Sequence, residues 1–393
     1  MLSTPPSPLP YGRQHITDED VAAVVATLRS DFLTQGPRVT EFEEKFAAYV
    51  GAKFAVAVSN GTAALHLCAL ALQVRPGQRV ITTPITFAAS ANCVRYCGGE
   101  VYFADIDPAT GLLDLQKVRQ LLEAHPKGFF TGLIPVDFAG LAVNMEEARA
   151  LADEYDLWII EDACHAPGGF FIDKQGVERR CGSGQLAELA IFSFHPVKHI
   201  ATGEGGMITT NDELLYRHLR RLRTHGIERE ASGLLRQDEG GWYMEMQELG
   251  YNYRISDILC ALGISQLARA DAGLARRREL ARAYDAAFAD TPGVEVLAPG
   301  RPGHAYHLYV IQVADRRGLY EFLRGKNILA QVHYVPVHRM PYYEKLGWKA
   351  GDFPAAEAYY ARCLSLPLYP TLTDDEQAYV IDCVQEFLAR NPA

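Results

Sequence analysis

Lys198 lies in the stretch SFHPVKHIATGEGG, where small, turn-forming and polar residues follow an apolar run. A lysine in such a place can be a surface residue with a buried stem, a phosphate ligand, or an amine held for covalent chemistry. This stretch alone leaves all three readings open. The choice depends on the polar residues that the rest of the chain can bring beside the amine.

Two other apolar runs also end in polar residues. FAVAV (54–58) leads into SNGTAAL, where Ser59 or Asn60 can cap a helix whose first amides would face an anion. LWIIED (157–162) ends in the carboxylate of Asp162. Each feature alone is more typical of an ordinary helix start or of a carboxylate that caps a loop. Together, an anion cradle, a carboxylate and an amine match what pyridoxal phosphate requires, with the lysine amine as a general base.

Short β-rich runs alternate with helical patterns over roughly the first half of the chain, which predicts an α/β fold. Ligands bind beyond the carboxyl ends of parallel strands in such folds, so the three polar ends would meet there. From about Ala268 a long helix rich in Arg and Ala is followed by a Pro/Gly break, and we expect a large domain over 1–267 and a smaller one over 268–393. The expected strands are 54–58, 79–83, 100–105, 131–136, 157–162, 189–194 and 206–210.

Composition narrows the class of protein. The 393 residues are 48% hydrophobic and carry a net charge of −10 with scattered Lys and Arg, which argues against a nucleic-acid or anionic-membrane surface. We therefore expect small molecules or copies of the same chain as partners. The eight cysteines form no Cys-x-x-Cys pair, which favours reduced, buried thiols. With no signal peptide and no apolar run of about 18 residues, we expect a cytoplasmic protein.

Six motifs resemble the sugar aminotransferases of the DegT/DnrJ/EryC1/StrS family: SNGTAAL, TTPITFAASAN, EDACHA, FSFHPVKHIATGEGG, LRTHGI and GYNYRISDILCALGISQL. The resemblance extends from LTQGP near residue 34 to LSLPLYPTLTDDE near residue 376, nearly the whole chain. It implies a pyridoxal-phosphate enzyme with the aspartate aminotransferase fold (type I). That fold has a mixed, mostly parallel central sheet flanked by helices and a smaller α+β C-terminal domain.

Other stretches look most like the transaminases that form UDP-4-amino-4,6-dideoxy-N-acetyl-β-L-altrosamine on the pseudaminic acid pathway. These stretches are PYGRQ, SDFLTQGP, PITFAASANCVRYCG, MQELGYNYR and VHYVPVHRMPYYEKLGW. The closer resemblance implies transfer of the amino group of L-glutamate to C4 of a UDP-linked 4-keto-6-deoxy-N-acetyl hexose. The related transaminases for UDP-4-amino-4-deoxy-L-arabinose share the core motifs, so that sugar remains an alternative.

Carried over residue by residue, the resemblance implies that Lys198 forms the Schiff base and that Asp162 is the partner of the ring nitrogen. Phe87 and His165 would lie on opposite faces of the cofactor ring. Asn252 would reach the phosphate of the neighbouring subunit, which implies a homodimer with shared active sites. The phosphate would also be held by Gly61, Thr62 and Ser193.

The resemblance further implies a set of aromatic and hydrogen-bonding side chains for the sugar nucleotide. The alternative interpretation of His307 and His333 is that each is an interior histidine whose ring nitrogens are hydrogen-bonded within the protein. The pairs His195 with His199 and His333 with His338 lack a carboxylate or thiolate at fitting spacing, so we expect no metal site. The expected sugar-nucleotide residues are Tyr11, Asp31, Phe32, Leu33, Thr34, Arg254, His307, His333 and Tyr334.

Two stretches need separate interpretation. The connector FIDKQGVERRCGSG (171–184) is longer and more basic than the family pattern. Its Lys174, Arg179 and Arg180 could meet a diphosphate, but a solvated hairpin is the more typical structure. The glycines that follow Lys198 would leave room for a sugar nucleotide to approach the backbone.

Three rival functions each require a different sign in the sequence. A nicotinamide oxidoreductase needs Gly-x-Gly-x-x-Gly directly after an early strand, whereas GEGG follows the lysine. A sugar dehydratase of this fold would resemble the family with a histidine in place of Lys198. A non-catalytic regulator built on the fold would be expected to drop the lysine or to add a basic DNA-binding segment.

Overall fold

The computed structural model describes residues 7–236 and 239–391 and is built around a seven-stranded sheet of order β2-β10-β9-β6-β5-β3-β4. The strand β10 runs antiparallel to both of its neighbours, and the other six strands are parallel. All seven expected runs form these strands, so the predicted α/β fold is confirmed. The strands are β2 (Phe54–Val58), β3 (Arg79–Thr82), β4 (Glu100–Phe103), β5 (Gly132–Ile134), β6 (Trp158–Asp162), β9 (Leu189–Ser193) and β10 (Gly206–Thr210).

Helices cover both faces of this sheet because its strands are apolar on both faces. In β2, Val56 and Val58 pack into one hydrophobic core while Ala55 and Ala57 pack into another. The first core holds α3 (Gly61–Ala71), α4 (Ala89–Tyr96) and α7 (Glu213–Arg223). The opposite face packs against α2 (Pro37–Val50), α5 (Leu115–Glu123), α6 (Met145–Tyr155) and α8 (Asp257–Leu267).

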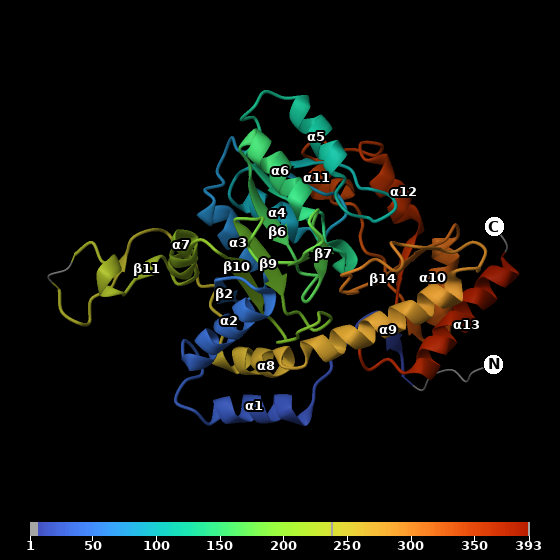
Figure 1. The fold of residues 1–393 in the computed structure, drawn as a ribbon, viewed down its shortest axis with the longest axis horizontal. Helices are drawn as coiled ribbons and strands as arrows, with labels where there is room; N and C mark the ends of the chain where they lie inside the picture. The colour runs from blue at the N-terminus through green and yellow to red at the C-terminus, as the bar shows by residue number, and fades with distance from the viewer. Residues whose placement is uncertain (1–6, 237–238, 392–393) are drawn as a thin grey trace.

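The long helix α9 (Ala270–Phe288) leads from the sheet into the C-terminal part of the chain (Figure 1). That part has a hydrophobic core of its own. The boundary between residues 267 and 268 remains a prediction, and it falls where α8 ends and α9 has not yet begun. The core is built from β13 (Glu295–Val296), β14 (Tyr309–Gln312), β16 (Cys363–Leu366), α10 (Arg316–Gly325) and α13 (Asp374–Arg390), with α12 (Pro354–Arg362) beside the sheet.

The beginning of the described chain packs against this C-terminal core. The short strand β1 (Leu9–Pro10) pairs in parallel with β15 (Ile328–Leu329). Leu9 is 2% exposed and belongs to the C-terminal core. The helix α1 (Asp18–Leu28) then returns to pack on α8 (Figure 1). The segment before α1 therefore connects the two parts of the molecule.

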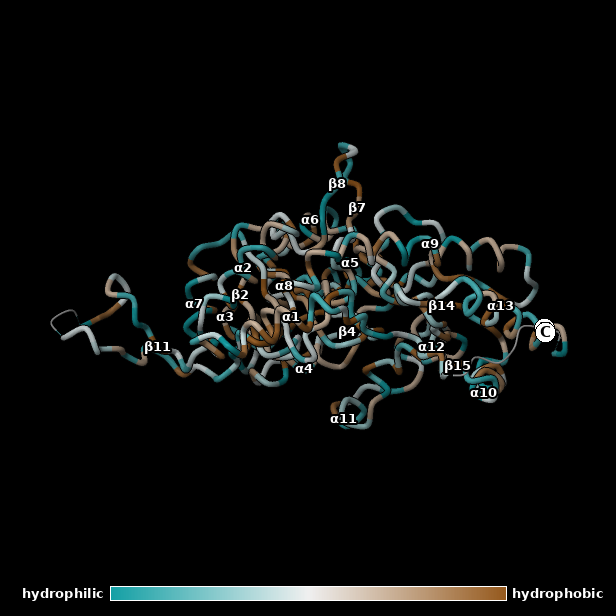
Figure 2. The backbone as a smooth tube through the Cα atoms, turned by 90° about the horizontal axis from the view of Figure 1, so that it is seen from below, coloured by the Kyte–Doolittle hydropathy of each residue, from teal (hydrophilic) through white to brown (hydrophobic). Residues whose placement is uncertain are grey.

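The segment with β7 (Phe170–Ile172) and β8 (Glu178–Arg180) and the segment with β11 (Ile227–Glu228) both project from the body (Figure 2). The strands β7 and β8 form an antiparallel hairpin, which confirms the hairpin expected over 171–184. Its Arg179 pairs with Asp173 inside the hairpin, and Arg180 donates to the carbonyl oxygen of Tyr49 and so joins the hairpin to the end of α2. The second projection carries β11 and β12 (Glu245–Met246).

All eight cysteines are free, as expected for reduced thiols. Among the described residues no single helix has the length and composition of a membrane span. The helices α8 and α9 meet that test together by length and composition alone, with a bend of 57° between them.

The carboxyl groups of Asp137 and Glu161 and the thiol of Cys181 form a buried cluster beside β6. One carboxyl oxygen each of Asp137 and Glu161 and the sulfur of Cys181 lie within 4.8 Å of one another, and all three residues are buried. Amides of Val143 and Gly182 each donate to one carboxylate oxygen at 2.9 Å, but Oδ2 of Asp137 has no partner among the described residues. No ion pair joins either carboxyl to a described lysine or arginine. Burial raises the pKa of Asp137 to about 7 and that of Glu161 well above its usual value.

This cluster predicts a pH-dependent loss of stability. Between about pH 4 and pH 7 Asp137 keeps its proton in the folded protein and loses it in the unfolded chain, so the free energy of unfolding falls as pH rises through this window. Asp137→Asn removes the titration and supplies amide hydrogens in place of the proton. We expect urea denaturation to show the variant gaining about 2 kcal/mol over wild type between pH 5 and pH 8.

The exposed Asp156, which ends α6, supplies the control, because Asp156→Asn should leave the pH dependence almost unchanged. Parallel pH curves for wild type and Asp137→Asn would contradict a protonated Asp137 in the folded protein. So would one equivalent of a divalent cation in the purified protein that disappears in Cys181→Ser, because a cation would then neutralise the cluster.

Candidate active site

A cavity of about 670 Å³ opens at the carboxyl ends of β2, β6 and β9. It is lined by residues from both ends of the chain as well as from the sheet. Most of the residues that the sequence predicted for the cofactor meet here, together with four of those predicted for the sugar. The predicted residues on its wall are Tyr11, Gly61, Thr62, Phe87, Asp162, His165, Ser193, Lys198, His307, His333 and Tyr334.

The start of α3 forms an anion cradle on one wall of the cavity. Asn60 caps the helix, since its side-chain oxygen accepts the amide of Ala63 at 2.8 Å. A Cβ on Gly61 would lie 3.1 Å from Cβ of Ser193, so the glycine brings the helix start close to that hydroxyl. Free amides, the positive end of the helix dipole and a hydroxyl together suit a phosphate group.

Two of the glycines after Lys198, Gly205 and Gly206, are accounted for by internal packing, whereas the space around Gly203 is open. β10 lies between β2 and β9, so the start of α3 must cross its first residue, Gly206, to reach Ser193. A Cβ on Gly206 would lie 2.5 Å from the carbonyl oxygen of Asn60. A Cβ on Gly205 would likewise meet the hydroxyl of Thr202 at 2.3 Å. Both glycines are therefore required by internal packing.

Asp162 ends β6 with its carboxylate in the cavity and only 5% of the residue exposed. Ser90 donates to Oδ2 at 2.7 Å, and the backbone amide of Cys164 donates to Oδ1 at 3.2 Å. Glu161, the preceding residue, points to the opposite face of the sheet because side chains alternate along a strand. Asp162 is thus oriented by two donors and keeps acceptor capacity for a third.

The amine of Lys198 reaches the same cavity from the turn after β9. The backbone amide of Lys198 donates to the carbonyl oxygen of His195 at 2.8 Å, which fixes the turn. Burial lowers the pKa of the amine, while the nearby Cys164 and Asp162 raise it in part. A lysine whose ammonium form is destabilised in this way is more readily available as a neutral amine.

Three predicted histidines surround the amine in their neutral form. Burial lowers the pKa of His165 and His307 well below the usual value, with a further contribution from the charge of Lys198, and lowers that of His333 to about 3. His165 accepts the amide of Ala139 at Nδ1 (3.3 Å). The proton of the neutral ring therefore lies on Nε2, which contacts the hydroxyl of Tyr334 at 3.2 Å.

His333 and His307 differ in how their other ring nitrogen is used. Nδ1 of His333 contacts the hydroxyl of Ser365 at 2.9 Å, and the ring packs edge-on against Tyr11 at 4.7 Å. Nε2 of His307 lies 3.5 Å from Nζ of Lys198, and its Nδ1 is buried without a partner among the described residues. His307 is therefore not a fully satisfied interior histidine.

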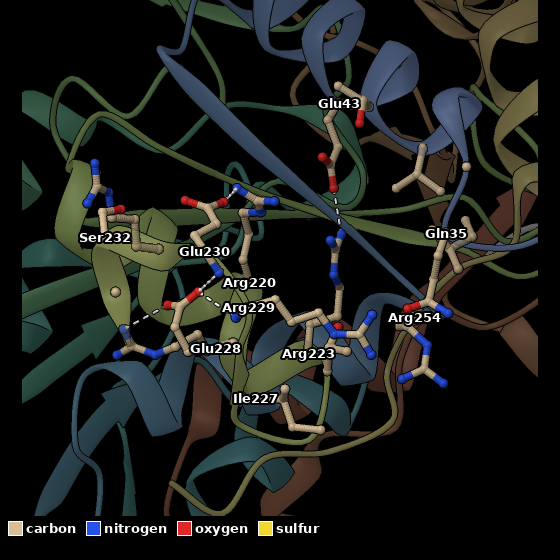
Figure 3. A pocket seen from close by; sticks show the side chains of 18 residues that line it. Gln35, Glu43, Arg220, Arg223, Ile227, Glu228, Arg229, Glu230, Ser232 and Arg254 are labelled. Atoms are coloured by element: carbon tan, nitrogen blue, oxygen red, sulfur yellow. Dashed lines mark hydrogen bonds and ion pairs between the residues drawn. The ribbon is translucent and has the colours of Figure 1, made fainter. Parts of the chain in front are cut away.

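The remaining predicted residues lie outside this cavity. Arg254 lines a second cavity of about 300 Å³ together with Gln35, in a setting rich in arginine and glutamate side chains (Figure 3). Asn252 is exposed, and its backbone bridges to that of Thr224. The segment 31–34 runs beside the start of α8, where the amide of Asp257 donates to the carbonyl oxygen of Leu33. None of the residues Asp31, Phe32, Leu33, Thr34, Asn252 and Arg254 meets Lys198 within one chain.

Several residues on the cavity wall were not singled out from the sequence. Ser90 orients Asp162, and it follows the predicted Phe87 by one helical turn, which was the signal available for it. Tyr253 contacts Nδ1 of His66 at 3.0 Å, and both lie on the wall. Tyr253 stands directly between Asn252 and Arg254 in the motif GYNYR. Its position inside the motif was the only sequence signal for it.

The residues present fit pyridoxal phosphate. The cradle at α3 offers amides and a hydroxyl to a phosphate, Asp162 has a free acceptor for a protonated ring nitrogen, and Lys198 offers an amine. Phe87 is 62% exposed at the cavity and presents a ring face that nothing in the described chain covers fully.

Comparison with known proteins agrees with this geometry. The chain is 40% identical over 391 residues to the spore coat polysaccharide biosynthesis protein SpsC of Bacillus subtilis, covering 97% of each chain. It is 36% identical over 392 residues to the UDP-4-amino-4,6-dideoxy-N-acetyl-β-L-altrosamine transaminase of Campylobacter jejuni serotype O:2, covering 97% of this chain and 98% of the relative.

A solved structure extends the likeness to the fold. Helicobacter pylori PseC, an aminotransferase involved in the biosynthesis of pseudoaminic acid, superposes with a TM-score of 0.88 at 30% identity over 98% of this chain and 100% of that one. The model of the DegT/DnrJ/EryC1/StrS aminotransferase family matches residues 14–385. The fold is that of type I pyridoxal-phosphate aminotransferases, and pyridoxal phosphate is the cofactor. The chain belongs to the DegT/DnrJ/EryC1/StrS aminotransferase family and is a sugar aminotransferase.

Proposed function

We propose that the protein transfers the amino group of L-glutamate to C4 of a UDP-linked 4-keto-6-deoxy-N-acetyl hexose, giving UDP-4-amino-4,6-dideoxy-N-acetyl-β-L-altrosamine. The observation that carries the proposal is the meeting of the Lys198 amine, the Asp162 carboxylate and the cradle at α3 in one cavity. The choice of sugar is supported by the likeness to the Campylobacter jejuni transaminase and to Helicobacter pylori PseC. The identity to SpsC keeps other nucleotide-sugar 4-aminotransferases, including the L-arabinose type, as the alternative.

The cradle and the carboxylate would hold the cofactor. When bound, pyridoxal phosphate supplies a carbonyl carbon that accepts an amino group and a ring that draws electrons from it. Gly61, Thr62 and Ser193 would hold its phosphate, and Asp162 would keep its ring nitrogen protonated. Ser90 and the amide of Cys164 orient Asp162 by two hydrogen bonds, so the carboxylate needs no rearrangement to do so.

The rings on the wall would fix the plane of the cofactor. Phe87 would pack against one face and His165 would lie on the other. His165 is held by the amide of Ala139 and by Tyr334, so it cannot turn freely. Its burial keeps it neutral, and it therefore adds no positive charge beside the ring.

Lys198 would move the protons of the reaction. The amine can accept a proton only in its neutral form, and the lowered pKa increases the share of that form near neutral pH. The same amine would serve both halves of the transamination: the glutamate half, in which glutamate gives up its amino group, and the sugar half, in which the amino group is delivered to C4 of the keto sugar. Tyr11, His333 and Tyr334 lie on the wall around it and offer rings and hydrogen-bonding groups to a pyranose.

A second copy of the chain would complete the site. Asn252, Arg254 and the segment 31–34 match the family pattern for ligand contacts but lie outside the cavity of their own chain. In a homodimer these residues would reach the cofactor phosphate and the sugar nucleotide of the partner.

Loss of Lys198 tests the mechanism. We expect Lys198→Ala to fold, to bind the cofactor without a borohydride-sensitive visible absorption band, and to lose activity by about 10³-fold. Lys198→Arg is the matched control for charge and should be equally inactive. The measurement is amination of a panel of UDP-4-keto sugars with glutamate, with products identified by mass spectrometry and NMR. Near wild-type rates in Lys198→Ala would overturn the mechanism, and amination of the 4-ketopentose alone would overturn the choice of sugar.

Mixed dimers test the shared site. Lys198→Ala and Asn252→Ala subunits, each with its own affinity tag, would be co-expressed and the heterodimer purified. If Asn252 serves the partner's site, one site of the heterodimer carries both changes and the other carries neither. We expect about half of the wild-type activity per dimer. Activity no higher than that of the better parent would show that Asn252 does not act across the interface.

A further inference from the structure

The backbone around His307 is held in place by hydrogen bonds from a buried arginine. His307 follows Tyr306, whose φ of 48° is in the left-handed region. The guanidinium of the fully buried Arg277 donates to the carbonyl oxygens of Leu368 (2.8 Å), Tyr306 (3.2 Å) and His307 (3.5 Å). Strained backbone that is held by buried charged groups is typical of functional sites.

A second set of contacts joins this segment to the turn that holds His165. The amide of Ala305 donates to the carbonyl oxygen of Gly140 at 2.7 Å, and the amide of Leu308 donates to that of Ala139 at 3.1 Å. Gly140 has a φ of 99°, and a Cβ there would lie 2.8 Å from the nitrogen of Tyr306 and 2.9 Å from that of His307. The absence of a side chain at residue 140 is what allows the two segments to approach.

The outcome of these contacts is that the His307 ring lies between other histidines and beside the Lys198 amine. Its centroid is 4.3 Å from that of His165 and 6.0 Å from that of His199. Nε2 of His307 is 3.5 Å from Nζ of Lys198. The neutral ring can accept a hydrogen bond there, whereas a charged ring would repel the ammonium.

The other ring nitrogen argues against a purely structural role. With Nε2 accepting from the amine, Nδ1 carries the proton, and it is buried without an acceptor among the described residues. An unsatisfied buried donor costs on the order of 1 to 3 kcal/mol, so a residue chosen only for packing would rarely be a histidine here. The contact of Nε2 with the amine of Lys198 explains why residue 307 is a histidine.

We infer that His307 is a positioning residue for Lys198: its Nε2 accepts a hydrogen bond from the amine whenever the amine is free and keeps Nζ directed into the cavity. This inference rests on the proposed function. It replaces the sugar contact that the sequence suggested for His307. The groups that act on the pair are Asp162, Cys164, His165, His199, Arg277 and His333.

The two half-reactions separate this role from a sugar contact. Lys198 moves protons in both halves, so loss of its positioning should slow both, whereas loss of a sugar contact should affect only the sugar half. We expect His307→Leu to lower kcat by about 10²-fold both for solvent-deuterium exchange into Cα of glutamate and for amination of the keto sugar. KM for the sugar should change little. His307→Gln, whose amide can accept near the position of Nε2, should recover most of the loss.

A matched control and a readout independent of turnover complete the experiment. The control is His304→Asn, because His304 is a buried histidine on the same segment whose Nδ1 accepts the amide of Tyr306 at 2.9 Å and Asn can replace that acceptor. The readout is the pH dependence of trapping Lys198 in the apoprotein with added pyridoxal phosphate and borohydride, located by peptide mass spectrometry. Loss of the acceptor destabilises the ammonium, so the profile of His307→Leu should move to lower pH.

The outcomes distinguish this inference from the proposed function. If Lys198→Ala is inactive while His307→Leu retains normal rates in both halves and a normal trapping profile, His307 does not position the lysine. A rise in KM for the sugar with a normal glutamate half would restore the sugar contact and overturn the inference. Activity in Lys198→Ala would overturn the proposed function itself.

Discussion

A lysine amine held out of water is the constraint on which the rest of the site depends. A buried ammonium is unfavourable unless its surroundings compensate, and here the compensation is small. Asp162 and Cys164 lie close enough to act on the amine, but the histidines around it are neutral. The surroundings thus lower the pKa of the amine without filling the cavity with competing charge. The cavity can then take an anionic cofactor whose phosphate goes to the helix start and whose ring goes to the carboxylate.

The antiparallel strand β10 determines where these groups can meet. It separates β2 from β9, so the helix start after β2 and the hydroxyl at the end of β9 are not on adjacent strands. Only a residue without a side chain at the start of β10 lets α3 pass over it. On β6, the neighbour of β9, side chains alternate between the two faces, so Glu161 points to the buried cluster with Asp137 and Asp162 points into the cavity. One strand end therefore provides two carboxyl groups with separate surroundings.

The sequence predicts the sheet well because each of its strands is a short, continuous apolar run with punctuation on both sides. It predicts the cradle, Asp162 and Lys198 because each stands at the end of such a run. It does not reveal the antiparallel direction of β10, since an apolar run looks the same in both directions. Nor does it reveal Ser90 or the lysine contact of His307, because these depend on how α4 and the segment 304–308 pack against the sheet. Whether Asn252 serves its own cavity or a partner's is a matter of assembly, which a single chain does not encode locally.

The pairing of β1 with β15 has a consequence for the order in which the molecule can be completed. The amide of Tyr11 donates to the carbonyl oxygen of Leu329, and its carbonyl oxygen accepts the amide of Leu368. Tyr11 precedes every strand of the seven-stranded sheet in the chain, yet the groups that fix it follow all of these strands. The seven-stranded sheet can form without them, because its last strand ends at Thr210. The cavity wall is therefore closed only after synthesis has passed Leu368, and a nascent or truncated chain would have the sheet without a finished binding site.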